Sequence, residues 1–444
     1  MSSKQFYQPT RVQDSIDVTA TFLQATLTSR GVTAMVSPLF NGPQVQAFRV
    51  DLAVGVKPEQ IERMSGALAI AAGADHCRVS RRRGCLMIEV PKPPENRKVL
   101  TAERLLKFEP DSSWKVPLGL DTRGEVLWFD LLSERNCHAV LGGTTGSGKT
   151  NLLHWMLFRL MKQNPTGQLQ LLMMDPKGFE LQPFSRCRHL LHPPADRPDE
   201  IVQLLLWVQD QMKKRSESHT RNPRILVVID EVKELATHKK RVKKILASIA
   251  QIGRGLGIHL LTSTQQPGAK ALGDAVANFP ARLLGRVASA TLAYGAAGRA
   301  KSQANELLGQ GDFLLLTSDG SVRFQAPLMD DQLLERLPST DRVAELDLGT
   351  TIDLNTFSAA DRRGGHNRKP LDLEKVRRMV LDEGKTAGHL NHRLGINYDR
   401  AERLVIIARA VSQGADVLSI SHHFDIPHTR ATQLVDAFGG NGKE

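Results

Sequence analysis

Apolar runs of strand length alternate with helical stretches between residues 111 and 338 of the chain. Alternation of this kind is typical of a mostly parallel sheet with helices on both faces. The pattern therefore predicts an α/β domain over 111–338. The expected strands are the runs HAVL, LQLLMMD, RILVVID, IHLLTST and FLLLTS.

The regions that flank this domain carry different patterns. Residues 1–110 combine a helical pattern over 16–30 with short alternating runs over 45–54 and 85–91, which predicts a small α+β domain. Residues 339–370 are polar and end in DRRGGHNRKP, so we interpret them as a linker.

The last segment, 371–444, contains an internal repeat. LNHRLGINYDRAERLVI (390–406) aligns with ISHHFDIPHTRATQLVD (420–436), and each copy has the pattern of a short helix, a tight turn and a second helix. This pattern predicts tandem helix-turn-helix modules that bind DNA. A pair of small helical modules that bind protein is the alternative. The coinciding positions are His392/His422, Ile396/Ile426, Arg400/Arg430, Ala401/Ala431, Leu404/Leu434 and Val405/Val435.

Composition and charge narrow the class of protein. The 444 residues are 41% apolar and 24% charged, as in globular proteins, and no run approaches the ~18 consecutive apolar residues of a membrane span. The N-terminus has no basic segment followed by an apolar one, so we expect a cytoplasmic protein without membrane insertion. The net charge of +12 favours a polyanionic partner, of which nucleic acid is the commonest.

A glycine-rich stretch, GGTTGSGKTN (142–151), joins the first apolar run to a helical pattern and fits G-x-x-x-x-G-K-[ST]. In such a loop the backbone N–H groups surround phosphates, the lysine bridges the β- and γ-phosphates, and the hydroxyl after it binds magnesium. We therefore expect ATP and Mg²⁺ as cofactors, with Thr150 as a metal ligand; a purely structural glycine turn is the alternative. The candidate residues are Gly143, Thr144, Thr145, Gly146, Ser147, Gly148, Lys149, Thr150 and Asn151.

Two later strand ends carry polar side chains that suit hydrolysis. RILVVIDE (224–231) ends in two acids, of which Asp230 would hold the magnesium through water and Glu231 would polarise an attacking water. Gln265 follows a strand predicted to adjoin Asp230, where it would sense the γ-phosphate. The alternatives are a helix cap for the acids and a loop start for the glutamine. Glu231 favours an ATPase that hydrolyses and cycles.

With these residues placed, the chain strongly resembles the FtsK/SpoIIIE family of double-stranded DNA translocases. Its motifs follow the family's order, and the resemblance extends to the family's small domain (40–64) and to its C-terminal winged-helix module (389–405). The motifs are AVLGGTTGSGKTN (139–151), LLMMDPKGFEL (171–181), IAQIGRGLGIHLLTSTQQP (249–267), ANFPARLLGRV (277–287) and ELLGQGDFLL (306–315).

The resemblance implies a RecA-like P-loop ATPase that assembles into a homo-oligomeric ring, with a hexamer as the expected state, encircles double-stranded DNA and walks along it. The family's membrane-spanning N-terminal part is missing, so we expect a soluble form. In such a ring a basic residue of the neighbouring subunit completes the catalytic site. Arg282 matches that role, Arg254 is the second candidate, and a surface salt bridge is the alternative for either. A recombinase or other DNA-processing partner is left open.

Candidate DNA contacts depart in part from the family's pattern. Ala290 and Tyr294 occupy positions where basic residues are expected, so Arg299 and Lys301 become the candidates for contact with the phosphate backbone. In the repeat, Arg400 and Arg430 either contact phosphate or support the fold through a local ion pair. The candidates for base or backbone contact there are Asn397, Tyr398, Arg400, Arg403, His428, Thr429 and Arg430.

These features favour an ATP-driven translocase of double-stranded DNA whose C-terminal modules recognise or orient the DNA. Two alternatives remain: a partition or regulatory protein that nucleotide binding switches without processive movement, and a coupling ATPase that hands DNA to a secretion channel. Glu231 and a trans-acting arginine imply repeated turnover, so they favour the translocase over the nucleotide-switched regulatory protein. They do not separate it from the coupling ATPase.

Overall fold

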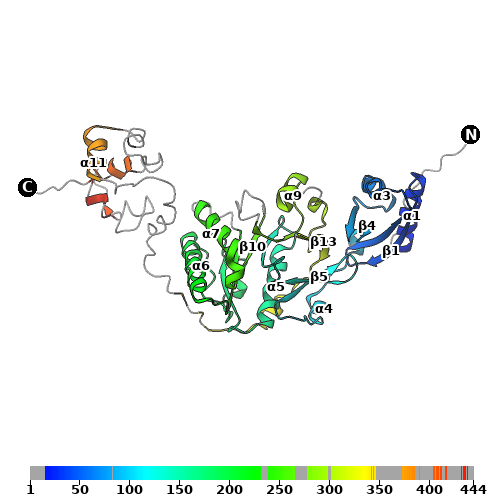
Figure 1. Ribbon diagram of the computed structural model, residues 1–444, viewed down its shortest axis with the longest axis horizontal. Helices are drawn as coiled ribbons and strands as arrows, with labels where there is room; N and C mark the ends of the chain where they lie inside the picture. Colours follow the sequence, from blue (N-terminus) through cyan, green and yellow to red (C-terminus); the bar gives the residue numbers. More distant parts are fainter. Residues whose placement is uncertain are drawn as a thin grey trace, which may run out of the picture. The chain divides into compact units, whose positions relative to one another are not determined.

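The structure, a computed structural model, describes two compact units, Met1–Thr350 and Thr351–Glu444 (Figure 1). In the first unit the described residues are 16–82, 84–231, 239–265, 278–298, 302–341, 343 and 345–346. In the second unit they are 373–385, 390, 404–405, 407–409, 411–412, 416–417, 432, 434–436 and 438.

The N-terminal part of the first unit is a small α+β domain. Its four-stranded antiparallel sheet has the order β1-β2-β4-β3, and helices cover the sheet's apolar face. Leu23 and Leu27 of α1 pack with Phe48 and Ile88 of the sheet in one buried core. The elements are α1 (Ile16–Ser29), β1 (Ala34–Asn41), β2 (Val45–Leu52), α2 (Pro58–Glu62), α3 (Ser65–Ala71), β3 (Arg78–Arg82), β4 (Cys85–Pro91) and the 3₁₀ turn η1 (Pro94–Asn96).

The larger domain is built on a nine-stranded sheet with the order β6-β5-β13-β12-β11-β7-β10-β9-β8. All five apolar runs predicted as strands belong to it. The strands are β5 (Lys115–Asp121), β6 (Val126–Asp130), β7 (His138–Gly142), β8 (Leu169–Met174), β9 (Arg224–Asp230), β10 (Ile258–Thr264), β11 (Ala281–Leu284), β12 (Asp312–Thr317) and β13 (Gly320–Gln325).

This sheet is mixed, so the prediction of a mostly parallel sheet is wrong in that respect. The strands from β11 through β7, β10 and β9 to β8 are parallel, whereas β12, β13, β5 and β6 pair antiparallel. The antiparallel half begins at β12, which pairs antiparallel with β11 although no hairpin joins these two strands. Strands β12 and β13 are then joined by a short hairpin, which needs no crossover helix.

Helices cover both faces of the parallel half (Figure 1). Helix α5 is buried on nearly every side, and Trp155 at its centre packs with strand residues and donates to the Pro117 carbonyl at 2.6 Å. Helix α7 contacts β10 and α6. The remaining elements are α4 (Ala102–Leu106), α5 (Lys149–Gln163), α6 (Pro198–Ser218), α7 (Lys239–Ile252), α9 (Ala290–Ala297), α10 (Asp331–Leu334), and the turns η2 (Gln182–Phe184), η4 (Gly253–Leu256) and η6 (Ala304–Glu306).

In the second unit, α11 (Leu373–Arg377) and the π-helical turn η8 (Arg378–Asp382) pack on a small apolar core. Leu404 and Leu434, which coincide in the sequence repeat, are both buried in that core. The two copies of the repeat therefore share one core. The helix-turn-helix and winged-helix prediction depends mainly on positions outside the described residues, so it stays a prediction.

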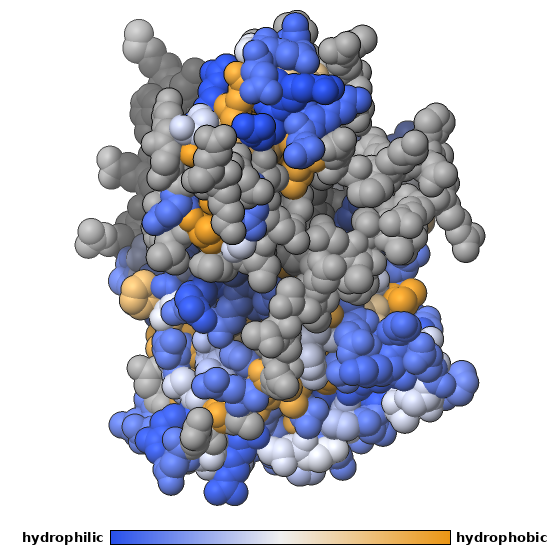
Figure 2. Space-filling view, turned by 90° about the vertical axis from the view of Figure 1, so that its left-hand side faces the viewer, coloured by the Kyte–Doolittle hydropathy of each residue, from blue (hydrophilic) through white to orange (hydrophobic). Residues whose placement is uncertain are grey.

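Within the described part of the chain, no helix has both the length and the apolar character needed to cross a bilayer. Figure 2 shows the described surface on one face of the molecule as mostly hydrophilic, with apolar residues in small separate patches. Scattered apolar residues of this kind are ordinary on protein surfaces.

Candidate nucleotide-binding site

The candidate residues meet at one edge of the sheet because β7, β8, β9 and β10 are parallel neighbours. Strand β10 lies between β7 and β9, with Ser263 in register with Leu141 on one side and with Asp230 on the other. The glycine-rich loop begins directly after β7, and Gln265 follows β10. The carboxyl edge of parallel strands is where ligands bind in open α/β sheets.

The loop from Gly143 to Gly148 needs glycine for both its backbone angles and its packing. Gly143 and Gly148 have φ angles of 151° and 95°, which other residues rarely adopt. A Cβ on Gly148 would lie 2.8 Å from the Gly311 nitrogen, and one on Gly143 would lie 2.7 Å from Ser147 Oγ. The close approach of a second backbone therefore accounts for Gly148, and the Ser147 side chain together with the φ angle accounts for Gly143.

Segments far away in the sequence support the same loop. Thr144 donates through its backbone N–H and its hydroxyl to the Arg286 carbonyl, at 2.8 and 3.1 Å. The Ser147 hydroxyl is buried and finds no hydrogen-bond partner among the described residues. A buried polar atom of this kind needs a partner, and a phosphate oxygen in the loop would supply one. The loop therefore fits a phosphate group.

The first turn of α5 places a lysine beside two acids. Burial lowers the pKa of Lys149, while the charges of Glu231 and Asp230 act in the opposite direction. Thr150 is half-buried in the same turn. Asn151 uses its side-chain amide elsewhere, donating to the Pro327 carbonyl at 2.6 Å and accepting from the Met329 N–H at 2.8 Å. The side chain of Asn151 thus anchors a neighbouring segment.

Asp230 ends β9 and is buried. Burial raises the pKa of Asp230, and the nearby carboxylates Asp175, Glu180 and Glu231 act in the same direction, while a hydrogen bond with Ser263 opposes them. A cation next to Asp230 would favour its ionised form. The position therefore suits a carboxylate that binds magnesium.

Glu231 follows with a left-handed backbone, φ 49°, although it is neither glycine nor exposed. Its carboxylate accepts from the Thr264 hydroxyl at 3.0 Å and from the Gln265 N–H at 3.2 Å. The Lys177 ammonium lies 3.7 Å from the same carboxylate. Sparsely populated backbone angles persist where surrounding contacts impose them, often at functional sites. Three groups thus fix the direction of the Glu231 side chain.

The loop after β8 adds residues that the sequence reasoning missed. Asp175 is buried and accepts from the N–H groups of Lys177 (3.0 Å), Glu180 (2.7 Å) and Leu181 (3.1 Å). This fold of the loop carries Lys177 to Glu231. The available signal was the run LQLLMMD, since its end lies at the same sheet edge as the ends of β7, β9 and β10.

Both candidate arginines contact their own chain. Arg282, in the middle of β11, donates to the Ala296 carbonyl at 3.0 Å near the C-terminal end of α9. Arg254 is 43% exposed and pairs with Glu134 at 2.7 Å. These contacts fix where each guanidinium lies within one subunit. They leave the role in a neighbouring site a prediction.

The candidate DNA contacts lie outside the described residues, in both units. On α9, Tyr294 is 61% exposed, at a position where the resemblance called for a basic residue. The candidates concerned are Arg299, Lys301, Asn397, Tyr398, Arg400, Arg403, His428, Thr429 and Arg430.

The glycine-rich loop lies between β7 and α5, and the acid pair Asp230–Glu231 lies at the end of β9, two strands away in the sheet. This arrangement defines a P-loop ATPase-like fold. Comparison with known proteins shows which families the chain is similar to. Residues 106–220 match the FtsK/SpoIIIE family, and residues 2–92 match the FtsK alpha domain. These matches confirm the resemblance seen in the motifs.

The similar proteins include the DNA translocases FtsK of Chlamydia trachomatis and Listeria monocytogenes, each 26% identical to this chain. The alignments cover 91% and 97% of this chain and 55% and 56% of the two relatives. The chain therefore spans about half the length of the curated relatives it matches. Among solved structures, the pCW3 conjugation coupling protein TcpA with ATPγS aligns at a TM-score of 0.48 and 20% identity, covering 71% of this chain and 96% of that one.

Proposed function

We propose that the protein is an ATP-driven motor that forms a ring around double-stranded DNA and moves along it. The observation that carries the proposal is the meeting of the phosphate-binding loop, Lys149 and the Asp230–Glu231 pair at one sheet edge. The relatives named DNA translocase, which align with nearly the whole chain, support DNA as the cargo.

ATP would bind with its phosphates in the loop 143–148 and with Lys149 against the β- and γ-phosphates. A bound Mg²⁺, with Thr150 and Asp230 as its ligands, would offset the negative charge of the phosphates. Glu231 would take the proton of the water that attacks the γ-phosphorus. The Thr264 hydroxyl and the Gln265 N–H orient that carboxylate, and the Gln265 side chain is exposed at the same edge.

Assembly would complete the site. Charge on the transferred phosphoryl group increases in the transition state, so an arginine from the neighbouring subunit would accelerate hydrolysis. Arg282 is our candidate for that arginine and Arg254 the alternative, with a hexamer as the proposed ring. Arg299 and Lys301 are proposed to contact the DNA backbone, and the segment 371–444 to recognise or orient the DNA. Backbone contacts predict affinity that falls as salt rises.

The test is the displacement of a third strand from linear duplex DNA, with and without ATP. The parental protein is compared with Lys149→Ala and with Glu231→Gln. Movement along the duplex would strip the third strand only when ATP and Lys149 are both present. Glu231→Gln should bind ATP and DNA but displace nothing.

Two other outcomes would favour other functions. Hydrolysis on DNA without strand displacement would contradict the motor and favour a partition or regulatory protein switched by nucleotide. Hydrolysis by Glu231→Gln at the parental rate would show that this residue is not the base. Strand displacement by itself does not exclude a coupling ATPase. A DNA-transfer assay in cells tests that alternative function.

A further inference from the structure

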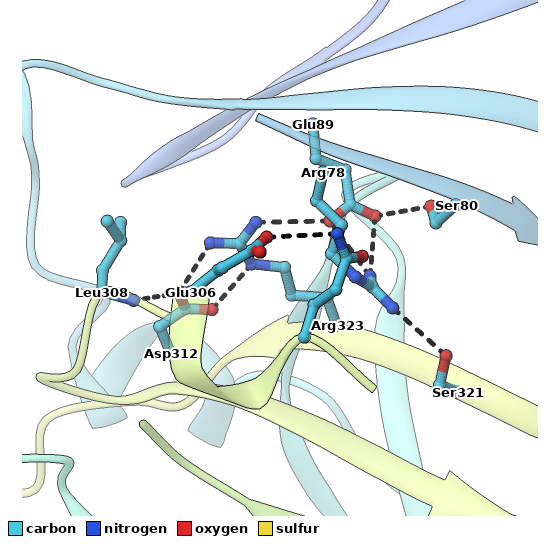
Figure 3. Close-up of polar contacts among 9 residues, drawn as sticks. Arg78, Ser80, Glu89, Glu306, Leu308, Asp312, Ser321 and Arg323 are labelled. Carbon is cyan, nitrogen blue, oxygen red and sulfur yellow. Dashed lines mark hydrogen bonds and ion pairs between the residues drawn. The ribbon is translucent and has the colours of Figure 1, made fainter. Parts of the chain in front are cut away.

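Four buried charged side chains join the small N-terminal sheet to the large sheet (Figure 3). Arg78 on β3 and Glu89 on β4 come from the small domain, and Asp312 on β12 and Arg323 on β13 come from the large one. None is more than 5% exposed. Two positive and two negative groups balance, which is how buried charges are tolerated. We call these four residues the interdomain charge cluster.

Arg323 is the centre of the cluster. Its Nε and Nη2 donate to the two oxygens of Asp312 at 2.9 and 2.7 Å, and its Nη1 donates to Glu89 at 3.3 Å. Burial acts to lower the pKa of Arg323, but Asp312 and Glu89 outweigh it and the net shift is upward. Burial likewise acts to raise the pKa of Glu89, but the charges of Arg78 and Arg323 outweigh it and lower the value. The pair therefore remains ionised.

Asp312 extends this connection toward the nucleotide site. Its second oxygen also accepts from the Leu308 N–H at 2.8 Å, and its own N–H donates to the Gly309 carbonyl at 3.0 Å. The carboxylate that Arg323 holds thus closes the loop 308–311. From the small domain, the Gln44 amide also reaches this loop and donates to the Gln310 carbonyl at 3.4 Å.

The same loop lies directly against the phosphate-binding loop. The N–H groups of Gln310 and Gly311 donate to the carbonyls of Gly146 and Ser147 at 2.9 and 3.0 Å. There is no room between the two backbones, as the predicted clash of a Cβ on Gly148 with Gly311 shows. A shift of the loop 308–311 would therefore move the peptides that face the phosphates.

We propose that Glu89 and Arg323 are positioning residues for the phosphate-binding loop, through which the small domain sets the affinity for nucleotide. The connection runs from Glu89 through Arg323 and Asp312 to the loop 308–311, and from there to Gly146 and Ser147. This inference rests on the proposed nucleotide site. It gives the small domain a part in forming that site, although none of the proposed nucleotide-binding residues comes from that domain.

Glu89→Gln tests the proposal, because it keeps the shape of the side chain and removes the charge that Arg323 pairs with. We expect the affinity for mant-ATP to fall by roughly 2- to 30-fold, the range in which substitutions along a coupling network act. Arg323→Lys, which keeps the charge but loses the two-pronged contact with Asp312, should weaken binding as well. The matched control is Ser321→Ala, which removes the Ser321 contact with Arg78 at 3.2 Å in the same interface but touches no part of the loop 308–311.

Titrations are made well below the unfolding temperature of each variant. A purely structural role would lower that temperature and leave the affinity unchanged in folded Glu89→Gln, which would overturn the proposal. Equal losses in Glu89→Gln and Ser321→Ala would overturn it too, because the effect would then belong to the interface in general. A parental protein that does not bind mant-ATP would refute the nucleotide site itself.

A second measurement needs no variant. Coupling between two sites is reciprocal, so nucleotide binding must act back on the small domain. We expect mant-ATP to slow hydrogen exchange in peptides that cover β3 and β4 of the parental protein. Protection of the phosphate-binding loop without any change in β3 and β4 would overturn the proposal, even if Glu89→Gln failed to fold.

Discussion

Because two histidines are buried on the central strands, we expect the free energy of unfolding to decrease in acid. His138 on β7 and His259 on β10 are 1% and 0% exposed. The Leu260 N–H donates to His138 Nδ1 at 3.1 Å, which requires that nitrogen to be unprotonated. Burial, with a contribution from the charge of Arg254, lowers the pKa of His138 to about 4. Burial is also the main cause that lowers the pKa of His259 to about 3. Both rings are therefore neutral in the folded protein at pH 7.

The direction of the pH effect follows from these shifts. A histidine in the unfolded chain has a pKa near 6.5. Below that pH the two histidines are protonated in the unfolded state but stay neutral in the folded state. The free energy of unfolding should decrease from about pH 6.5 down to the folded-state values of about 4 for His138 and about 3 for His259. Each ring lowers the free energy of unfolding by ~1.4 kcal/mol for each pH unit below 6.5. At pH 5 the loss is therefore ~2 kcal/mol for one ring and ~4 kcal/mol for the two rings together. The figure at pH 5 depends mainly on the unfolded value, because both folded values lie lower.

The assay is urea unfolding at pH 7.5 and pH 5, followed by tryptophan fluorescence. His138→Asn and His259→Asn are suitable variants because an amide can accept from the Leu260 N–H or donate to the Cys137 carbonyl, which lies 3.1 Å from His259 Nδ1. Each variant should be less stable than the parent at pH 7.5. On going to pH 5, however, each should lose ~2 kcal/mol less than the parent, and the double variant ~4 kcal/mol less.

His219 provides the control for this prediction. It is exposed at the C-terminal cap of α6 with φ 53°, a conformation that asparagine adopts readily. His219→Asn should keep the full pH dependence of the parent. If the double variant His138→Asn/His259→Asn loses as much stability between pH 7.5 and pH 5 as the parent, the reasoning from burial is refuted.

Three further predictions concern the site and the second unit. Thr264→Val should lower the rate of ATP hydrolysis by ~10- to 150-fold by removing a hydrogen bond to Glu231, the proposed base, whereas Thr264→Ser should keep most of the rate; equal rates would contradict the proposed role. Gly298→Ala should lower thermal stability by ~1–3 kcal/mol, because its Cβ would lie 2.5 Å from the Arg282 guanidinium at φ +66°, while Gly295→Ala, in open space, should not. Deletion of 371–444 should reduce DNA sequence preference and leave DNA-stimulated hydrolysis largely intact; loss of all stimulation would show that the main DNA contact lies in the deleted segment.

The parallel half of the large sheet was predictable because its strands are buried on both faces. Such strands appear in a sequence as continuous apolar runs, which is how β7, β8, β9 and β10 were found. Their common direction then brings Asp230, Gln265 and the glycine loop to one edge. This part of the candidate site could therefore be predicted from the apolar runs and from the rule that the carboxyl ends of parallel strands lie at one edge of the sheet.

Of the other strands only β12 was predicted, and two of the remaining strands show the physical reasons. Strand β11 has four residues, too few to show a period, and β13 places a buried arginine where the pattern indicates an exposed one. Arg323 is buried only because Asp312 and Glu89 neutralise it, and Glu89 belongs to another domain. The turns S-D-G (318–320) between β12 and β13 and T-R-G (122–124) between β5 and β6 are local signals of hairpins, but neither indicates that β12 runs antiparallel to β11.

The same distinction separates the two kinds of residue at the nucleotide site. Residues proposed to contact the phosphates or the attacking water lie at strand ends and in a loop of fixed spacing, so the sequence alone was enough to propose Lys149, Asp230 and Glu231. Residues that act through others depend on partners from distant strands, as Thr264 does on Glu231. A positioning residue such as Glu89, which lies more than two hundred residues before Arg323 in the chain, has no local signal at all. We therefore expect substitutions in the small domain to change nucleotide affinity, although none of the proposed nucleotide-binding residues lies there.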